Sequence, residues 1–164
     1  MFDKQILVNA GCSPEVIAHS LTVSMVALSI AERVGAAVDR ELVRQGGLLH
    51  DIGRSRTHGI EHAIVGAEIA KRLGLSGALI NIIERHIGAG IPASEAERLG
   101  LPGKDYLPLT PEEKIVSYAD NLINGVAEVP FSEALDRFKI ILGPDHEGVC
   151  RFIRQHEEIQ GWMR

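Results

Sequence analysis

Apolar residues recur every three or four positions along most of this chain, which is the spacing expected for helices with one buried face. Start and stop residues support this pattern. Ser13-Pro14 is a typical helix start, and Gly35 and Gly74 are typical helix ends. The pattern predicts helices over residues 14–34, 39–49, 60–73 and 76–86.

The second half of the chain begins with a stretch rich in glycine and proline, residues 88–108, which predicts a loop with one short helix at 94–99. Thr110-Pro111-Glu112-Glu113 is then a strong helix start, with a glutamate at the capping-box position. Two more helices are expected near 132–142 and 146–162, and no alternating strand pattern of useful length appears. The sequence therefore predicts an all-α fold, a compact bundle of about six to eight helices.

Length and composition bound the class of protein. A chain of 164 residues with 45% hydrophobic and 24% charged residues suits one globular domain, so we expect residues 1–164 to form a single unit. The formal net charge is -5, which argues against non-specific binding to a nucleic-acid backbone, and no direct nucleic-acid binding is expected. A small anionic substrate remains compatible with this charge if a few local arginines and a metal hold it.

The cysteines and the N-terminus bear on the compartment. Cys12 and Cys150 form no CxxC unit, and two free thiols in a reducing environment are the expected state unless the fold brings them together. The N-terminus lacks a secretory signal pattern, and no apolar run is expected to approach the ~20 residues needed to span a bilayer. These observations favour a cytoplasmic protein that does not interact with a membrane.

The most informative feature is the segment His50-Asp51-Ile52-Gly53, at the end of an apolar helix. Two adjacent side chains of metal-ligand type are costly to bury without a partner for their polar atoms, and a bound cation would be such a partner. Imidazole and carboxylate together suit Fe, Mn, Co, Ni or Zn, whereas oxygen-only sites favour Mg or Ca. The other candidate ligands are His19, His62, His86 and Asp120.

These six residues could hold two ions. Four histidines and two aspartates are enough for two six-coordinate ions that share a carboxylate, and Asp51 would be the bridge because it lies between ligands from different helices. Two ions roughly 3.5–4 Å apart can hold both the attacking and the leaving oxygen of a phosphoryl group. The pattern therefore favours a metal-dependent phosphohydrolase with two ions, Fe or Mn first and Mg, Ni, Co or Zn as alternatives.

The same residues resemble the HD superfamily of metal-dependent phosphohydrolases, in its small archaeal and bacterial HDIG branch. The resemblance implies that His19, His50, Asp51 and Asp120 form a metal set. It also places two more residues, His62 and His86, where the binuclear branch has extra histidines. It covers residues 15–123 and leaves 126–164 as a C-terminal helical extension.

Arg54 stands where many members of the superfamily have lysine after HDIG. Arginine can bind phosphate through two parallel hydrogen bonds but is a poor proton donor, so Arg54 is expected to serve catalysis by holding substrate phosphate. Arg56 and His58 extend a basic cluster that would steer an anionic substrate, or else they belong to a solvated loop. Asn121 is a further candidate for substrate binding, and His58 is an alternative to His62 as a ligand.

The resemblance implies hydrolysis of a phosphoester or phosphoanhydride of a nucleotide-like substrate by a metal-bound hydroxide, with Asp51 and Arg54 as the catalytic residues. Dinucleoside polyphosphates and nucleoside mono- and diphosphates are the first substrates to test. A different class stays open, namely a metal-stabilised nucleotide-binding or regulatory module with little turnover. An open coordination position would favour the enzyme, because structural metal sites are closed. The sequence also leaves open whether the chain forms a homodimer.

Overall fold

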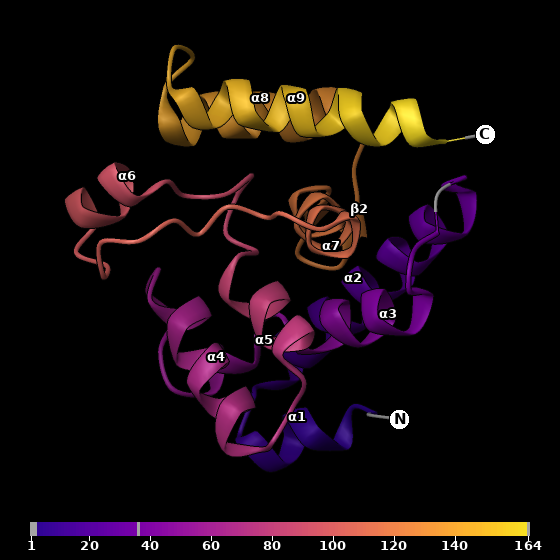
Figure 1. Cartoon of the computed structure of the whole chain (residues 1–164), viewed down its shortest axis with the longest axis vertical. Coiled ribbons are helices and arrows are strands. Elements are labelled where there is room, and N and C mark those ends of the chain that lie inside the picture. Colours follow the sequence, from indigo (N-terminus) through magenta and orange to yellow (C-terminus); the bar gives the residue numbers. More distant parts are fainter. Residues whose placement is uncertain (1–2, 36, 164) are drawn as a thin grey trace.

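The computed structural model describes residues 3–35 and 37–163. Within them the chain forms nine α-helices, one short 3-10 helix and a two-stranded hairpin, so the predicted all-α class is confirmed (Figure 1). In chain order the elements are α1 (Gln5–Ala10), α2 (Pro14–Arg33), α3 (Arg40–Leu49), η1 (Ile52–Ser55), α4 (His62–Arg72), α5 (Gly77–Glu84), α6 (Ala93–Arg98), α7 (Pro111–Asn121), β1 (Ile123–Asn124), β2 (Ala127–Glu128), α8 (Phe131–Leu142) and α9 (Glu147–Trp162).

Helix α1, the short helix η1 and the hairpin are absent from the sequence-based prediction. Helix α1 has only six residues, too few for an apolar period to be recognised, although its Leu7 is fully buried. The hairpin pairs only two residues from each strand, Ile123 with Glu128 and Asn124 with Ala127, so no alternation can develop. Helix α1 therefore brings the number of α-helices to nine, one more than the predicted six to eight. This short helix is stabilised by tertiary contacts rather than by its own sequence.

The centre of the bundle is built by α2, α3 and α7, which pack against one another. Their contact residues are small or β-branched, including the fully buried Val23, Ala27 and Val116. A Cβ atom on Gly47 would lie 2.7 Å from the Cα of Ser24, so α2 and α3 approach this closely only because residue 47 is glycine. The close approach brings the first histidine-bearing helix next to the end of α3.

Helices α8 and α9 run side by side across one end of the bundle (Figure 1). Three of the four phenylalanines of the chain gather here, and the rings of Phe138 and Phe152 stack with their centroids 4.2 Å apart. The ring of Phe131 lies 5.1 Å from that of Phe152. Aromatic packing thus joins the last two helices, and Phe152 is fully buried against the core.

Helix α2 is long and apolar enough, by length and composition alone, to cross a membrane. The expectation that no segment would approach that length is therefore wrong. In the structure α2 packs against α3 and α7, and its buried positions belong to the bundle core. Packing within the protein accounts for these buried positions, whereas Leu21 and Met25 on the same helix are exposed.

Both cysteines are free thiols, as expected. Cys12 is buried, and its Sγ lies 3.8 Å from the carbonyl oxygen of Ile52, whereas Cys150 is exposed on α9. Burial raises the pKa of the Cys12 thiol, with a further contribution from the nearby charge of Asp51.

Gly53 lies where η1 meets the start of α4. A Cβ atom on this residue would collide with the carbonyl oxygen of His62 and would lie 2.6 Å from the backbone nitrogen of Gly66. Backbone atoms cannot move aside as the end of a side chain can, so only glycine allows this contact. The contact sets how closely Asp51 and His62 approach each other.

We expect Gly53→Ala to destabilise the fold by about 2–3 kcal/mol or more, as overpacking against backbone does. For a chain of this size, that change lowers Tm by about 5–10 °C in thermal unfolding followed by circular dichroism. Gly77→Ala is the matched control, because a Cβ atom there meets nothing within 4 Å and alanine favours helix. Equal Tm values for the two variants would contradict this account of Gly53.

Candidate metal centre

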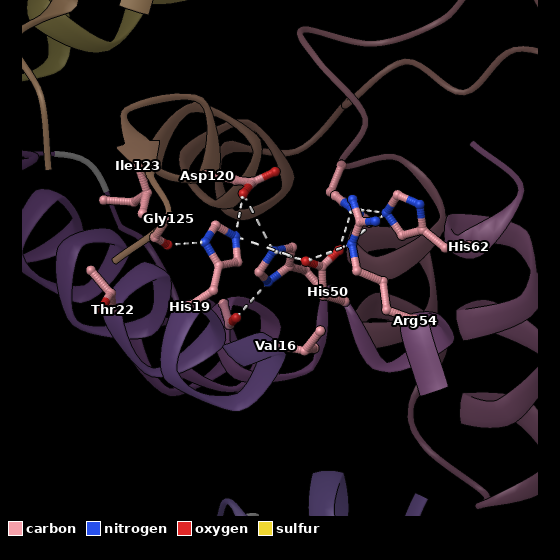
Figure 2. Close-up of polar contacts among 12 residues, drawn as sticks. Val16, His19, Thr22, His50, Arg54, His62, Asp120, Ile123 and Gly125 are labelled. Carbon is pink, nitrogen blue, oxygen red and sulfur yellow. Dashed lines mark hydrogen bonds and ion pairs between the residues drawn. The ribbon is translucent and has the colours of Figure 1, made fainter. Parts of the chain in front are cut away.

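All six predicted ligands lie close together in the bundle, in three overlapping groups. Figure 2 shows His19, Asp120 and His50 together on one side and His62 beside Arg54 on the other. The six ligands come from segments far apart in the chain. His19 lies on α2, His50 and Asp51 follow the last residue of α3, His62 begins α4, His86 follows α5, and Asp120 lies near the end of α7.

Asp51 occupies the middle of the cluster, and its two carboxylate oxygens face different histidines. Oδ1 lies 3.1 Å from Nε2 of His62 and 3.4 Å from Nε2 of His86. Oδ2 lies 3.5 Å from Nε2 of His50 and 3.8 Å from Nε2 of His19. One carboxylate therefore joins two pairs of imidazoles, which is the arrangement expected of a bridging ligand.

Asp120 completes the set around Oδ2. Its Oδ1 lies 2.9 Å from Nε2 of His19 and 3.4 Å from Nε2 of His50. Side-chain atoms bound at about 2.1 Å to one ion lie about 3–3.5 Å from one another, so most of these spacings match those of a shared cation.

Each of the four histidines directs its Nδ1 to a backbone carbonyl. The acceptors are Gly125 for His19 (2.7 Å), Gly47 for His50 (2.7 Å), Gly59 for His62 (2.8 Å) and Ile83 for His86 (2.7 Å). Because a neutral imidazole carries one proton, a donating Nδ1 leaves a lone pair on Nε2. Such second partners orient histidine ligands and fix their tautomer in metal sites.

A cation between the groups explains two features of the cluster. The Nε2 atoms of His62 and His86 lie 3.0 Å apart, and two lone pairs repel at that distance. Nε2 of His50 is buried and has no hydrogen-bond partner among the described residues. A bound metal ion resolves both situations, so the residues present fit the metal that the histidine-carboxylate composition predicts.

The pKa values of the two aspartates also fit a site for a cation. Burial alone would raise the pKa of Asp51, but the charge of His50 and the polar contacts with His62 and His86 hold this pKa far below the usual range. Burial likewise opposes ionisation of Asp120, and His50 and His19 keep its pKa low. Burial disfavours the charged form of His50, yet the two aspartates raise its pKa to about 9. The centre is thus built around two anionic carboxylates.

The centre opens into cavities on two sides. A cavity of about 760 Å³ lies on the His19 side, between the start of α2 and the turn at Gly125. A second cavity, of about 440 Å³, is lined by His62, His86 and Asp120. Arg54 and His58 line both cavities. A substrate can therefore approach the ligands directly, as an active site requires and a closed structural site does not allow.

Arg54 lies at the junction of the two cavities. Its Nε is 3.0 Å from Oδ2 of Asp51, and its Nη1 donates to the carbonyl oxygen of His58 at 3.3 Å. The side chain is 31% exposed, so the guanidinium reaches both solvent and the bridging carboxylate. This is the position from which a cation can contact a phosphate held at the centre.

The other predicted substrate-binding residues are placed differently. Arg56 is exposed and is not among the residues that line either cavity. His58 lines both cavities but precedes α4, and the structure brings His62 rather than His58 to the ligand cluster. The amide of Asn121 donates to the carbonyl of Gly88 at 2.9 Å, which engages it with the protein itself. A substrate contact by Arg56 or Asn121 stays a prediction.

The sequence reasoning missed the turn of the hairpin. The carbonyl of Gly125 orients His19, and Gly125 has a positive φ of 64° between the two strands. Asn124 pairs with Ala127, so the two loop residues are Gly125 and Val126. Glycine at the first of two loop residues is a known signal of a hairpin turn, and this signal was available in the sequence.

The family model described as HD domain matches residues 16–125. The chain belongs to the HD-domain family. The uncharacterized protein MJ0778 of Methanocaldococcus jannaschii is 53% identical over 93% of this chain and 92% of its own length. Residues 16–125, which the family model matches, contain all six predicted ligands, so the resemblance to the HD superfamily is confirmed.

Other relatives of the HD-domain chain are longer proteins. The tRNA (cytidine(56)-2'-O)-methyltransferase of Picrophilus torridus is 42% identical over 94% of this chain but only 44% of its own length. Ribonuclease Y of Pseudothermotoga lettingae is 41% identical over 65% of this chain and 18% of its own length. The chain therefore spans less than half of these two relatives.

Solved structures share the HD fold. The HD domain of the L. monocytogenes phosphodiesterase PgpH, solved in complex with cyclic-di-AMP, matches with a TM-score of 0.60 and 18% identity. The match covers 96% of this chain and 93% of the other. The structural similarity thus extends beyond the residues matched by the family model.

We expect the protein, purified without chelator, to bind two metal ions per chain. The variant His86→Ala should retain about one ion, because the ligands around Oδ2 of Asp51 remain. Elemental analysis measures this. His146→Asn is the matched control. It removes an imidazole outside the centre and keeps a residue that can cap α9. Equal metal loss in both variants, or none in His86→Ala, would contradict the assignment.

Proposed function

We propose that this HD-domain chain is a metal-dependent phosphohydrolase that cleaves a phosphoester or phosphoanhydride of a nucleotide-like substrate. The observation that carries the proposal is the Asp51 carboxylate placed between two pairs of histidine Nε2 atoms. With Fe or Mn bound there, the ions would activate water and neutralise the charge that develops on the phosphoryl oxygens.

The residues of the chain have separate tasks in this proposal. Asp51 joins the two ligand sets, and the Nδ1 hydrogen bonds of the four histidines hold every Nε2 in a ligating direction. Arg54 holds a non-bridging phosphate oxygen, because its guanidinium matches the geometry of phosphate and stays charged at every working pH. Because Arg54 lies beside Asp51 and lines both cavities, it would hold the phosphate at the point where the two cavities meet the centre.

The relatives support a substrate of this chemical class. PgpH is named a phosphodiesterase and its HD domain was solved with cyclic-di-AMP, and ribonuclease Y is named for RNA cleavage. The net charge of -5 supports a small nucleotide rather than a long nucleic acid, since the latter needs a basic surface.

The test is a turnover screen of the metal-loaded protein with nucleoside mono- and diphosphates, dinucleoside polyphosphates, cyclic dinucleotides and simple phosphodiesters. Asp51→Ala is expected to lose metal and turnover together, because both ligand sets depend on this carboxylate. Activity that survives in Asp51→Ala would refute the proposal. Metal binding without turnover across the panel would favour the nucleotide-binding or regulatory module.

We expect Arg54→Ala to lower kcat/KM by about 10- to 100-fold, the usual loss for one charge-assisted hydrogen bond to phosphate. Metal content should remain unchanged, because the arginine is not a ligand. Arg72→Ala is the matched control, since Arg72 is exposed at the end of α4 and lines neither cavity. If Arg54→Ala loses metal in proportion to activity, the arginine supports Asp51 rather than the substrate.

A further inference from the structure

Three hollows adjoin one another between the metal centre and the last two helices. The cavity beside His62 and His86 shares Gly88 and Ile141 with a small cavity of about 230 Å³. A third hollow of about 510 Å³, between α6 and the α8–α9 turn, shares Gly88 with both. We call these three adjoining hollows the C-terminal groove.

Beyond the metal ligands, the walls of the C-terminal groove carry five large apolar side chains. They come from the segment before α4, from the loop after α5 and from α8, and they are Ile60, Ile87, Phe138, Ile141 and Leu142. The ring of Phe138 is held by stacking on Phe152, so it offers a fixed surface. Apolar and aromatic walls with a few polar groups are typical of sites for nucleobases and similar ligands.

The far end of the groove is charged but does not suit phosphate. Glu95 forms an ion pair with Arg151 at 2.6 Å, so this arginine already has an anionic partner. Arg98 also lines this end, but the three carboxylates of Glu95, Asp145 and Glu147 outnumber the two arginines. Additional phosphates would meet carboxylates here, whereas an uncharged nucleoside would not.

We propose that the C-terminal groove binds the nucleoside of the substrate, and that Ile141 on α8 is a specificity-determining residue. This inference rests on the proposed function, because the metal centre places the phosphate. The adjoining hollows are where the rest of the substrate would lie. The lining residues from α8 lie outside residues 16–125, so the selective part of the site is separate from the metal-binding part.

Ile141 is well placed for this role. It lines the two hollows nearest the metal centre and is 71% exposed, so its side chain contributes little to the core. Its neighbour Ile140 is 84% exposed and lines none of the three hollows. The chain therefore supplies a matched control that differs by one position.

The cavity on the other side of the centre is the competing location. It is formed by the start of α2 and by Val126, which is 58% exposed, and it contains no aromatic residue besides the histidines His19 and His58. Its walls offer a nucleobase no fixed ring comparable to Phe138. Val126→Ala tests this location directly.

The experiment compares Ile141→Ala, Ile140→Ala and Val126→Ala in the manganese-loaded protein. Two substrates share a leaving group: the p-nitrophenyl ester of thymidine 5′-monophosphate carries a nucleoside, and methyl p-nitrophenyl phosphate does not. Ile141→Ala should raise KM for the thymidine ester about 5- to 10-fold through lost apolar contact, with kcat/KM for the methyl ester unchanged. Ile140→Ala and Val126→Ala should match the wild type with both substrates.

Calorimetric binding of thymidine 5′-monophosphate to the same proteins gives a readout that needs no turnover, so a failure of the proposed hydrolase activity can be recognised separately. Ile141→Ala should weaken this binding about 5- to 10-fold relative to Ile140→Ala. Three results would overturn the assignment of the groove. They are equal affinities for these two variants, no binding by the wild type at millimolar concentration, and weaker binding only in Val126→Ala.

Discussion

The carboxylate of Asp51 is the group on which the architecture of this protein depends. It is buried, and each of its oxygens faces two imidazoles from different parts of the chain. Such an arrangement demands that several helices end or begin within a few ångströms of one another. The glycines at positions 47 and 53 meet this demand, because they let α2 approach α3 and α4 approach η1 more closely than any larger residue would.

Much of the fold and the ligand set could be predicted from sequence because the signals are local. Capping residues and apolar periods define most helices. The ligand residues before and after His50-Asp51-Ile52-Gly53 follow an order along the chain that few other sites share. The remainder depends on contacts between distant segments. Gly125 orients His19 across 106 positions, and no local pattern reports such a pair. For the same reason the sequence could not separate Arg54, which reaches Asp51, from the exposed Arg56.

The comparisons find a similar region in proteins with different names. Relatives named as methyltransferase and ribonuclease contain a region similar to this chain within longer proteins. The HD-domain match of this chain includes every predicted metal ligand and ends before α8. Fold and metal ligands alone do not determine a substrate, so selectivity has to come from the groups around the centre.

The carbonyl partners of the histidines also have a consequence for folding. His50, His62 and His86 each bond a carbonyl three residues earlier, so the turn that carries the imidazole also orients it. His19 instead needs a carbonyl beyond α7, and closing so long a loop costs entropy that only the assembled bundle repays. Three ligands can therefore be aligned early, while the fourth is aligned only after α7 and the hairpin have docked. Full metal affinity is thus a property of the completed fold.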